Sequence, residues 1–361
     1  MYNENWDKSK ERFEALWRRE RIDRPSVSLR GLKDPMRPPE YLFRKSPEYL
    51  KRYFTDEQYI LDMQKERREK LFYLGDAFDC VNLYLGTGGH CAYTTKYIYR
   101  FEHPFTVWFS STMEDIAEET IVYDDCSELL GVTRRVLEHS VNTPGRDFLV
   151  SNTDNCSSLD ALASLRGNEN LLVDMILESD HVERHIAALQ GILFRTESEF
   201  LPKLISANDG GTVTDWMQLW CPGRHHQLQC DISVMISPEM FKRFALPELE
   251  ESANWFERTV YHFDGLEQIR HLDMLLSVMH IDLIQWTPVS GQPDTVEFIE
   301  ALKRIQKAGK GLVLMPHAYE MPKLLDELNP AGVHYLVRDL TTIEEAKDML
   351  TLIEKKSGCW K

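Results

Sequence analysis

Short apolar runs rich in β-branched residues alternate along this chain with longer segments in which apolar residues recur at helical spacing. The short runs have the length and composition of buried strands, and the longer segments have the periodicity of amphipathic helices. Strands that alternate with helices form parallel sheets, because each crossover returns the chain to the same end of the sheet. The predicted strands are 26–30, 79–85, 147–152, 212–219, 259–263, 281–286, 311–315 and 333–337.

Eight strand–helix units predict a (β/α)8 barrel, a fold that typically needs about 250 residues. The chain has 361 residues, so we place the surplus in a helical insertion at 32–75 and a loop-rich insertion at 86–125. No linker or internal repeat divides the chain, which predicts a single domain over 1–361. An open doubly wound sheet is the alternative. It is disfavoured because no glycine-rich phosphate-binding turn follows the first strand.

Helix ends are clearest in the second half of the chain. Ser237-Pro238-Glu239 predicts a helix start, with a serine N-cap and a proline in the first turn, and the helix runs to about Arg258. Pro293-Asp294 begins a helix that Gly309 ends. Thr341-Thr342 begins the last helix, whose first turn carries two glutamates that the helix dipole favours. These ends support the strand–helix alternation.

The charge balance narrows the choice of ligand. Lys and Arg number 42 and Asp and Glu number 58, which gives a formal charge of −16 and a pI near 5.3. Such a chain lacks the concentrated basic field that nucleic acids or polyanionic substrates require. No apolar run is long enough to cross a membrane, and the charged N-terminal segment has no signal-peptide pattern. Seven scattered cysteines without CxxC spacing are typical of free thiols, so we expect a cytoplasmic protein with a small-molecule substrate.

In a (β/α)8 barrel the reactive side chains lie at the C-terminal ends of the strands. This rule makes the strand ends of the present chain candidates for a site. Polar side chains are costly to bury unpaired, so their accumulation at strand ends indicates a pocket there. The candidates are Arg30, Tyr84, Asp154, Gln218, Trp220, Asp231, His262, Asp264, Gln285, Trp286, His317, Arg338 and Asp339.

The stretch YHFDG at 261–265 carries the sharpest signal among these candidates. His262 and Asp264 are separated by one residue, so they point to the same side of an extended strand end. An imidazole nitrogen and a carboxylate oxygen are two of the ligands that a catalytic zinc ion needs. Asp339, at the end of the last strand, is a candidate for the third ligand. The alternative is structural: Asp264 orients His262 or caps the following helix.

Several segments carry a family resemblance, in this order: KERFEALWRRERIDRPSVSL, SLDALASLRGNENLLVDMI, DISVMISPEMFKRFALPELEE, YHFDG, DLIQWTPVSG and AGVHYLVRDL. Together they resemble the uroporphyrinogen decarboxylase-like superfamily over nearly the whole chain. This group includes the decarboxylases of haem synthesis and the zinc-dependent methylcobamide:thiol methyltransferases. The resemblance implies a (β/α)8 barrel enzyme, often a homodimer.

Departures from the family pattern distinguish its branches. The decarboxylases carry an arginine-rich stretch after the first strand. Here that stretch reads SLRGLKDPMRPPEYL, with Arg30 and Arg37 but without the motif. The methyltransferases bind zinc through a His-x-Cys pair at strand five and a Cys at strand eight. The corresponding positions hold His262, Asp264 and, nearby, Asp339, so the resemblance implies either a zinc site in which carboxylates replace thiolates or a site that has lost its metal.

The leading hypothesis is a metal-assisted methyltransferase that moves a methyl group between a small substrate and a corrinoid supplied by a partner protein. In this hypothesis the metal ligands are His262, Asp264 and Asp339. Asp154 and Asp231 act as catalytic and orienting acids beside them. The substrate contacts are Arg30, Tyr84, Gln218, Gln285, His317 and Arg338, with Trp220 and Trp286 as the pocket wall.

Two alternatives stay open. A metal-free decarboxylase would use Asp154 or Asp231 to stabilise a protonated intermediate, and Arg30 and Arg338 would hold the substrate's carboxylates. A non-catalytic barrel would bind a ligand without turnover, and its binding would not depend on His262.

Overall fold

The computed structural model describes residues 5–82, 85–86, 88–95, 97–103, 106–287 and 289–358. Its main sheet has seven strands in the order β2-β1-β13-β12-β11-β10-β9. Neighbours pair in parallel, except that β2 runs antiparallel to β1. The strands are β1 (Ser26–Leu32), β2 (Leu71–Gly75), β9 (His225–Leu228), β10 (Arg258–Phe263), β11 (Leu283–Trp286), β12 (Gly311–Leu314) and β13 (Val333–Val337).

Further strands lie beside this sheet. The backbone N–H of Asn152 donates to the carbonyl oxygen of Val213 at 2.8 Å, and its side-chain amide donates to that of His225 at 3.0 Å. These bonds tie β6 to β7 and β9, although the described strands do not form one continuous hydrogen-bonded ring. The pairs are β3 (Cys80–Val81) with β6 (Leu149–Val150), parallel, and β4 (Ile98–His103) with β5 (Thr106–Ser110) and β7 (Gly211–Thr214) with β8 (Leu219–Pro222), antiparallel.

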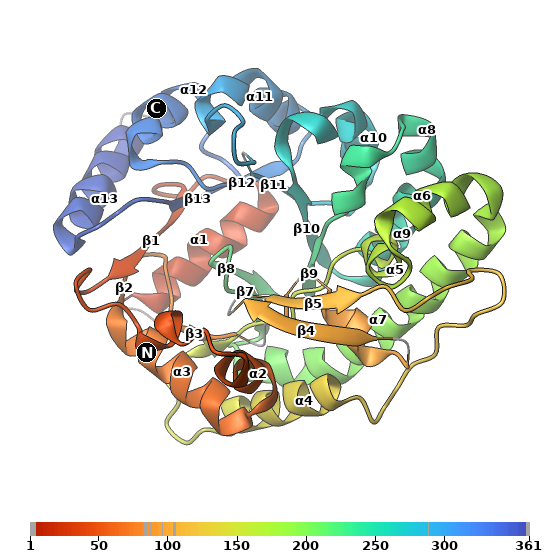
Figure 1. Ribbon diagram of the computed structural model, residues 1–361. Coiled ribbons are helices and arrows are strands. Elements are labelled where there is room, and N and C mark those ends of the chain that lie inside the picture. Colours follow the sequence, from red (N-terminus) through yellow and green to blue (C-terminus); the bar gives the residue numbers. More distant parts are fainter. Residues whose placement is uncertain are drawn as a thin grey trace.

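Helices surround the strands, and Figure 1 shows them as an outer ring. They turn apolar stripes inward, as α11 does with Ile299, Leu302 and Ile305. Among the described residues, no helix combines the length and apolar character needed to span a membrane. The helices are α1 (Trp6–Arg18), α2 (Pro47–Thr55), α3 (Glu57–Lys70), α4 (Glu128–Val141), α5 (Ser158–Arg166), α6 (Asn168–Leu177), α7 (Ser179–Ala207), α8 (Pro238–Met240), α9 (Leu246–Trp255), α10 (Leu272–Ser277), α11 (Ile299–Lys307), α12 (Met321–Glu327) and α13 (Ile343–Gly358).

Helix α1 crosses the centre of the strand arrangement in Figure 1. The indole N–H of Trp17 donates to the carbonyl oxygen of Trp220 in β8 at 2.9 Å. The Trp6 ring packs edge-to-face on the Trp220 ring, with 6.0 Å between centroids. These residues belong to a hydrophobic cluster that also contains Val260 and Leu283, near the starts of β10 and β11. Helix α1 therefore covers the end of the sheet at which these parallel strands begin.

The two predicted insertions have different structures. The segment 32–75 contains α2 and α3, in agreement with the helical prediction, and ends in β2, which extends the main sheet beside β1. The segment 86–125 contains the β4–β5 hairpin in addition to loops. Strand β4 of this hairpin contacts α2, and β5 contacts α5.

The predicted strand at 212–219 is wrong in its boundaries. The chain turns after β7 and returns antiparallel as β8. Gln218 in this turn has a φ of 51°, a left-handed conformation that a pattern of apolar residues does not reveal. The strand that pairs in parallel with β10 on the side away from β11 is β9. This correction moves the fourth strand end from Gln218 and Trp220 to the residues just before Asp231.

The predicted helix after Ser237 begins as expected but is not continuous. The Ser237 hydroxyl oxygen accepts a hydrogen bond from the backbone N–H of Met240 at 3.2 Å, which confirms the N-cap. From α8 the chain passes through a π-helical segment at Phe241–Ala245 into α9. Helix α9 ends at Trp255, three residues before the predicted end.

Candidate metal centre

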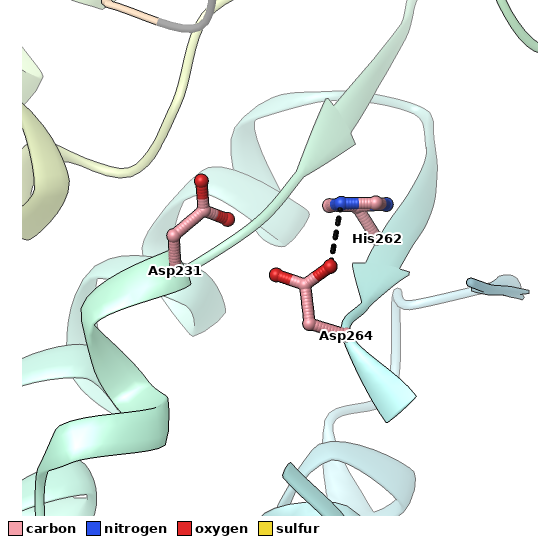
Figure 2. Close-up of side chains that lie close together, drawn as sticks. All are labelled: Asp231, His262 and Asp264. Atoms are coloured by element: carbon pink, nitrogen blue, oxygen red, sulfur yellow. Dashed lines mark ion pairs between the residues drawn. The ribbon is translucent and has the colours of Figure 1, made fainter. Parts of the chain in front are cut away.

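Two adjacent parallel strands position the candidate cluster at their C-terminal ends. Strand β9 ends at Leu228, and Asp231 follows at the start of a 3-10 helix (Asp231–Met235). Strand β10 carries His262 and ends at Phe263, which is fully buried. Because side chains alternate along a strand, His262 and Asp264 face the opposite side from Phe263. Figure 2 shows Asp231 facing this pair across a short gap.

Asp231, His262 and Asp264 each offer one ligand atom, and these atoms lie within 4.8 Å of one another. Nε2 of His262 lies 3.0 Å from Oδ1 of Asp264 (Figure 2). His262 and Asp264 are partly buried, whereas Asp231 is open to solvent on one side. The arrangement leaves a gap between three donors that a small ion could enter.

A hydrogen bond at Nδ1, the second ring nitrogen, holds the His262 ring in place. The sheet register places His262 beside Gln285 of β11, and Nδ1 of His262 hydrogen bonds to Oε1 of Gln285. The Gln285 amide donates in turn to the Thr287 hydroxyl at 2.6 Å. The Trp216 ring meets the imidazole edge-to-face, with 5.4 Å between centroids. A donated Nδ1–H is the usual support of a metal-binding histidine, because it leaves Nε2 free for the ion.

Asp231 is fixed through its backbone. The buried carboxylate of Asp160, in α5, accepts hydrogen bonds from the backbone N–H groups of Asp231 and Ile232, both at 2.8 Å. The Gln229 side-chain amide lies 3.3 Å from Oδ2 of Asp231. The position of Asp231 is therefore set by a helix from a distant part of the sequence.

The charges in the cluster act on one another. Burial alone would lower the pKa of His262, but hydrogen bonding to Asp264 and the negative charges of Asp264 and Asp231 raise this pKa to about 9. Burial acts to raise the pKa of Asp264, and its hydrogen bond to His262 lowers it below its usual value. The surrounding protein atoms and the charge of Asp160 raise the pKa of Asp231 to about 8, although part of this residue is exposed. The cluster therefore attracts positive charge.

A fourth acid lies at the inner end of the same polar network. Asp154 is buried and accepts a hydrogen bond from the Gln227 side-chain amide. Oε1 of Gln227 accepts from the indole N–H of Trp216 at 2.5 Å. Burial raises the pKa of Asp154 to about 7, against the opposing positive charge of His262. A carboxyl group with a pKa near neutrality can both give and accept a proton.

The donor set fits a divalent cation. One imidazole nitrogen and two carboxylate oxygens match the number and kinds of protein ligands in catalytic zinc sites, where a further position stays open to substrate. The same donors also suit the harder ions of iron and manganese. The residues present at the ends of β9 and β10 could therefore hold such an ion.

The structure does not place Asp339 in this cluster. Its carboxylate pairs instead with Nδ1 of His317. The His317 ring stacks on Tyr319, with 5.3 Å between centroids, and a β-bridge joins His317 to Arg338. The third group beside His262 and Asp264 is Asp231, for which the sequence predicted a catalytic and orienting role.

Other candidates also lie away from the cluster. Trp220 is buried against α1 and donates its indole N–H to Asn208. Trp286 is fully buried and stacks on Phe263. Neither ring therefore forms a wall of an open pocket.

Gln218 is buried in the β7–β8 turn and donates to Asp215, whose carboxylate also binds Arg30. Tyr84 lies outside the described residues.

A cavity of about 370 Å³ reaches the cluster at Asp231. Trp108 of β5 and Met235 give it exposed apolar walls, and Asp160 and Cys156 line it beside Asp231. The sequence did not indicate Asp160, which comes from helix α5, or Gln227 and Gln229, because the predicted fourth strand ended before them. With β9 at its true position, the residues after the strand would have indicated Gln229 together with Asp231, which was already a candidate.

Comparison with solved structures finds the same fold in another protein. A methyltransferase from Methanosarcina mazei is 12% identical and aligns over 96% of this chain and 98% of its own, with a TM-score of 0.59. A B12-independent methionine synthase from Shewanella sp. W3-18-1, in complex with selenomethionine, is 11% identical over 92% and 96%, and its TM-score of 0.42 supports no argument. The sequence matches no protein-family model and no curated protein. At this identity the first likeness establishes a shared fold.

Proposed function

We propose that this chain is a metal-dependent methyl-transfer enzyme, a divergent member of the uroporphyrinogen decarboxylase-like superfamily whose strands close into a (β/α)8 barrel. The observation that carries the proposal is the convergence of Asp231, His262 and Asp264 at the ends of two adjacent parallel strands. The fold shared with the methyltransferase from Methanosarcina mazei supports methyl transfer as the reaction class.

The residues around the cluster have distinct roles in this reaction. A zinc ion held by the three side chains would act as a Lewis acid toward a thiol or hydroxyl group of a small substrate. Gln285 orients the His262 ring, and Asp154 exchanges a proton at its carboxyl oxygen. A corrinoid carried by a partner protein would supply or accept the methyl group that the substrate heteroatom gains or loses.

The cavity beside Asp231 is the substrate's position in this proposal. Its volume of about 370 Å³ lies within the range of small-molecule sites. Trp108 and Met235 would contact an apolar part of the substrate, and Asp231 stands at the polar end. This arrangement favours a small substrate with one heteroatom near the ion.

Metal titration with a matched pair of variants tests the proposal. We expect the wild-type protein to bind one equivalent of zinc, measured by competition with a chromogenic chelator. His262→Ala should lose this binding, whereas His317→Ala, which removes the other histidine of a His–Asp pair at a strand end, should keep it. Equal zinc binding by His262→Ala and wild type would show that the metal assignment is wrong.

Activity can be measured with free methylcobalamin in place of a corrinoid protein. We expect the absorbance change of demethylation with at least one member of a panel of small thiols and alcohols, dependent on added zinc. His262→Ala should abolish the change. Demethylation that proceeds equally with a chelator present would contradict the role of the metal.

A metal-free lyase is a second candidate, and the buried Asp154 favours it. A carboxyl group with a pKa near 7 could protonate a carbanion or an electron-rich ring. Carbon dioxide release from a panel of small carboxylates, unaffected by chelator and lost in Asp154→Asn, would select this reaction over methyl transfer.

A further inference from the structure

A second cavity, of about 160 Å³, lies under the helical insertion. It is enclosed by α2, α3 and α4, and it shares no lining residue with the candidate metal centre or with the cavity beside Asp231. Most of its wall is apolar or aromatic. The residues that form this wall include Tyr53, Phe54, Ile60, Met63, Val132 and Val136.

One cationic side chain lines this cavity. Nη2 of Arg67 donates to Oδ2 of Asp215 at 2.7 Å. The Arg67 side chain is 20% exposed and lines the cavity, so an anion in the cavity could pair with its guanidinium group.

The charges around Arg67 do not cancel. Arg30 also donates to the Asp215 carboxylate, at 3.2 Å, so two guanidinium groups share one carboxylate and leave a formal charge of +1. Burial acts to raise the pKa of Asp215, but the charges of Arg67 and Arg30 outweigh it and hold this pKa below its usual value. Within the described residues, no other carboxylate forms an ion pair with either guanidinium. The excess charge favours an anionic occupant.

The neighbouring polar group is already satisfied. The side chain of Gln64 bonds to the backbone of Asn82 in both directions, donating to the carbonyl at 3.3 Å and accepting from the N–H at 3.4 Å. This leaves the guanidinium group of Arg67 as the charged group at the cavity wall.

The volume sets the size of the occupant. A dry apolar cavity of about 150 Å³ in a protein holds one benzene molecule, and the present cavity is about 160 Å³. We propose that it is a binding site for a monocyclic aromatic carboxylate. The ring lies among the side chains of α2, α3 and α4, and the carboxylate pairs with the guanidinium group of Arg67. This site does not depend on the metal centre.

Calorimetric titration with benzoate and with benzyl alcohol, a neutral molecule of similar size, tests the proposal. We expect one benzoate per chain, bound at least tenfold more tightly than benzyl alcohol, because only benzoate neutralises the charge at Arg67. The absence of saturable benzoate binding, or equal affinity for the two compounds, would overturn it.

Two variants locate the site, each with a matched control. Val136→Phe places a ring in the cavity and should abolish benzoate binding, whereas Val173→Phe, at an exposed position of α6, should keep it. Arg67→Gln should reduce benzoate affinity to that of benzyl alcohol. Arg68→Gln removes the same charge from the next residue, which pairs with Asp79 outside the cavity lining, and should retain the preference.

Folding and metal binding are measured on the same variants. Val136→Phe should keep the wild-type circular dichroism spectrum and the wild-type zinc titration. Retained benzoate binding in folded Val136→Phe would place the ligand elsewhere and refute the assignment. Loss of zinc binding in His262→Ala with benzoate binding intact would show that the two sites are independent.

Discussion

Two histidine–aspartate pairs lie at the C-terminal ends of parallel strands in the same sheet, and only one of them belongs to a cluster. His262 and Asp264 have side chains that are 17% and 19% exposed, and Asp231 stands opposite them. His317 and Asp339 are 29% and 60% exposed, and the ring of His317 stacks on Tyr319. Residue type at a strand end is therefore not enough to make a site; burial and a third converging group are what separate the two pairs.

The largest expected effect separates the two candidate third ligands. Asp231→Asn removes a carboxylate from the cluster, and we expect zinc affinity to fall by roughly 10³-fold, more than the 10–100-fold typical of an outer-shell partner. Asp339→Asn should leave zinc affinity within about twofold of wild type, as an exposed pair contributes little. Chelator competition measures both. If Asp339→Asn had the larger effect, the assignment of the third ligand would be reversed.

The next largest expected effect on zinc affinity concerns the group that holds each imidazole ring in place. Gln285→Leu removes the acceptor of the His262 Nδ1–H, and we expect zinc affinity to fall by about 10–100-fold because the ring loses its fixed orientation. Tyr319→Ala removes the ring that stacks on His317 and should not change zinc affinity. Comparable losses in both variants would mean that the two pairs are not functionally distinct.

The smallest expected effect is on the free energy of unfolding. It compares a buried acid with an exposed one. Burial raises the pKa of Glu197 to about 7. The folded state then binds more protons than the unfolded state between about pH 4.5 and 7, so the free energy of unfolding falls as the pH rises through this range. We expect Glu197→Gln to remove up to about 2 kcal/mol of this fall, measured by urea unfolding at pH 5 and 8. Asp339→Asn should leave the profile unchanged; a similar change in both variants would contradict the role of burial.

The sequence predicted those parts of the site that depend on local geometry. The side chains of His262 and Asp264 share one side because they are two residues apart at a strand end, and this holds for any extended backbone. The N-cap at Ser237 was also predictable, because the bond it makes is local.

The identity of the third ligand depended on which strands are neighbours. Asp339 follows β13, and the sheet places β11 and β12 between β13 and β10. Asp231 follows β9, which pairs directly with β10. The sequence did not reveal this proximity, because the β7–β8 turn has the apolar pattern of the middle of a single strand. The left-handed conformation of Gln218 in that turn is not visible in the pattern.

Aromatic residues near strand ends were the least predictable. Trp220 and Trp286 are aromatic residues of the kind that often lines a pocket. Trp220 packs against α1, however, and Trp286 packs against Phe263. Which side of a sheet a large ring occupies depends on the elements packed there, and those contacts come from distant segments. The wall found beside Asp231 includes Trp108 of the β4–β5 hairpin instead.

Helix α1 has a consequence for how the protein is made. Trp17 and the Trp220 carbonyl that it binds are 203 positions apart. Helix α1 therefore leaves the ribosome well before β8, on which Trp17 packs, has been translated. Its apolar face, with Phe13, Leu16 and Trp17, stays partly uncovered in the nascent polypeptide, where exposed apolar surface promotes aggregation. We expect the yield of folded protein from cells to depend on chaperones that hold this helix during translation.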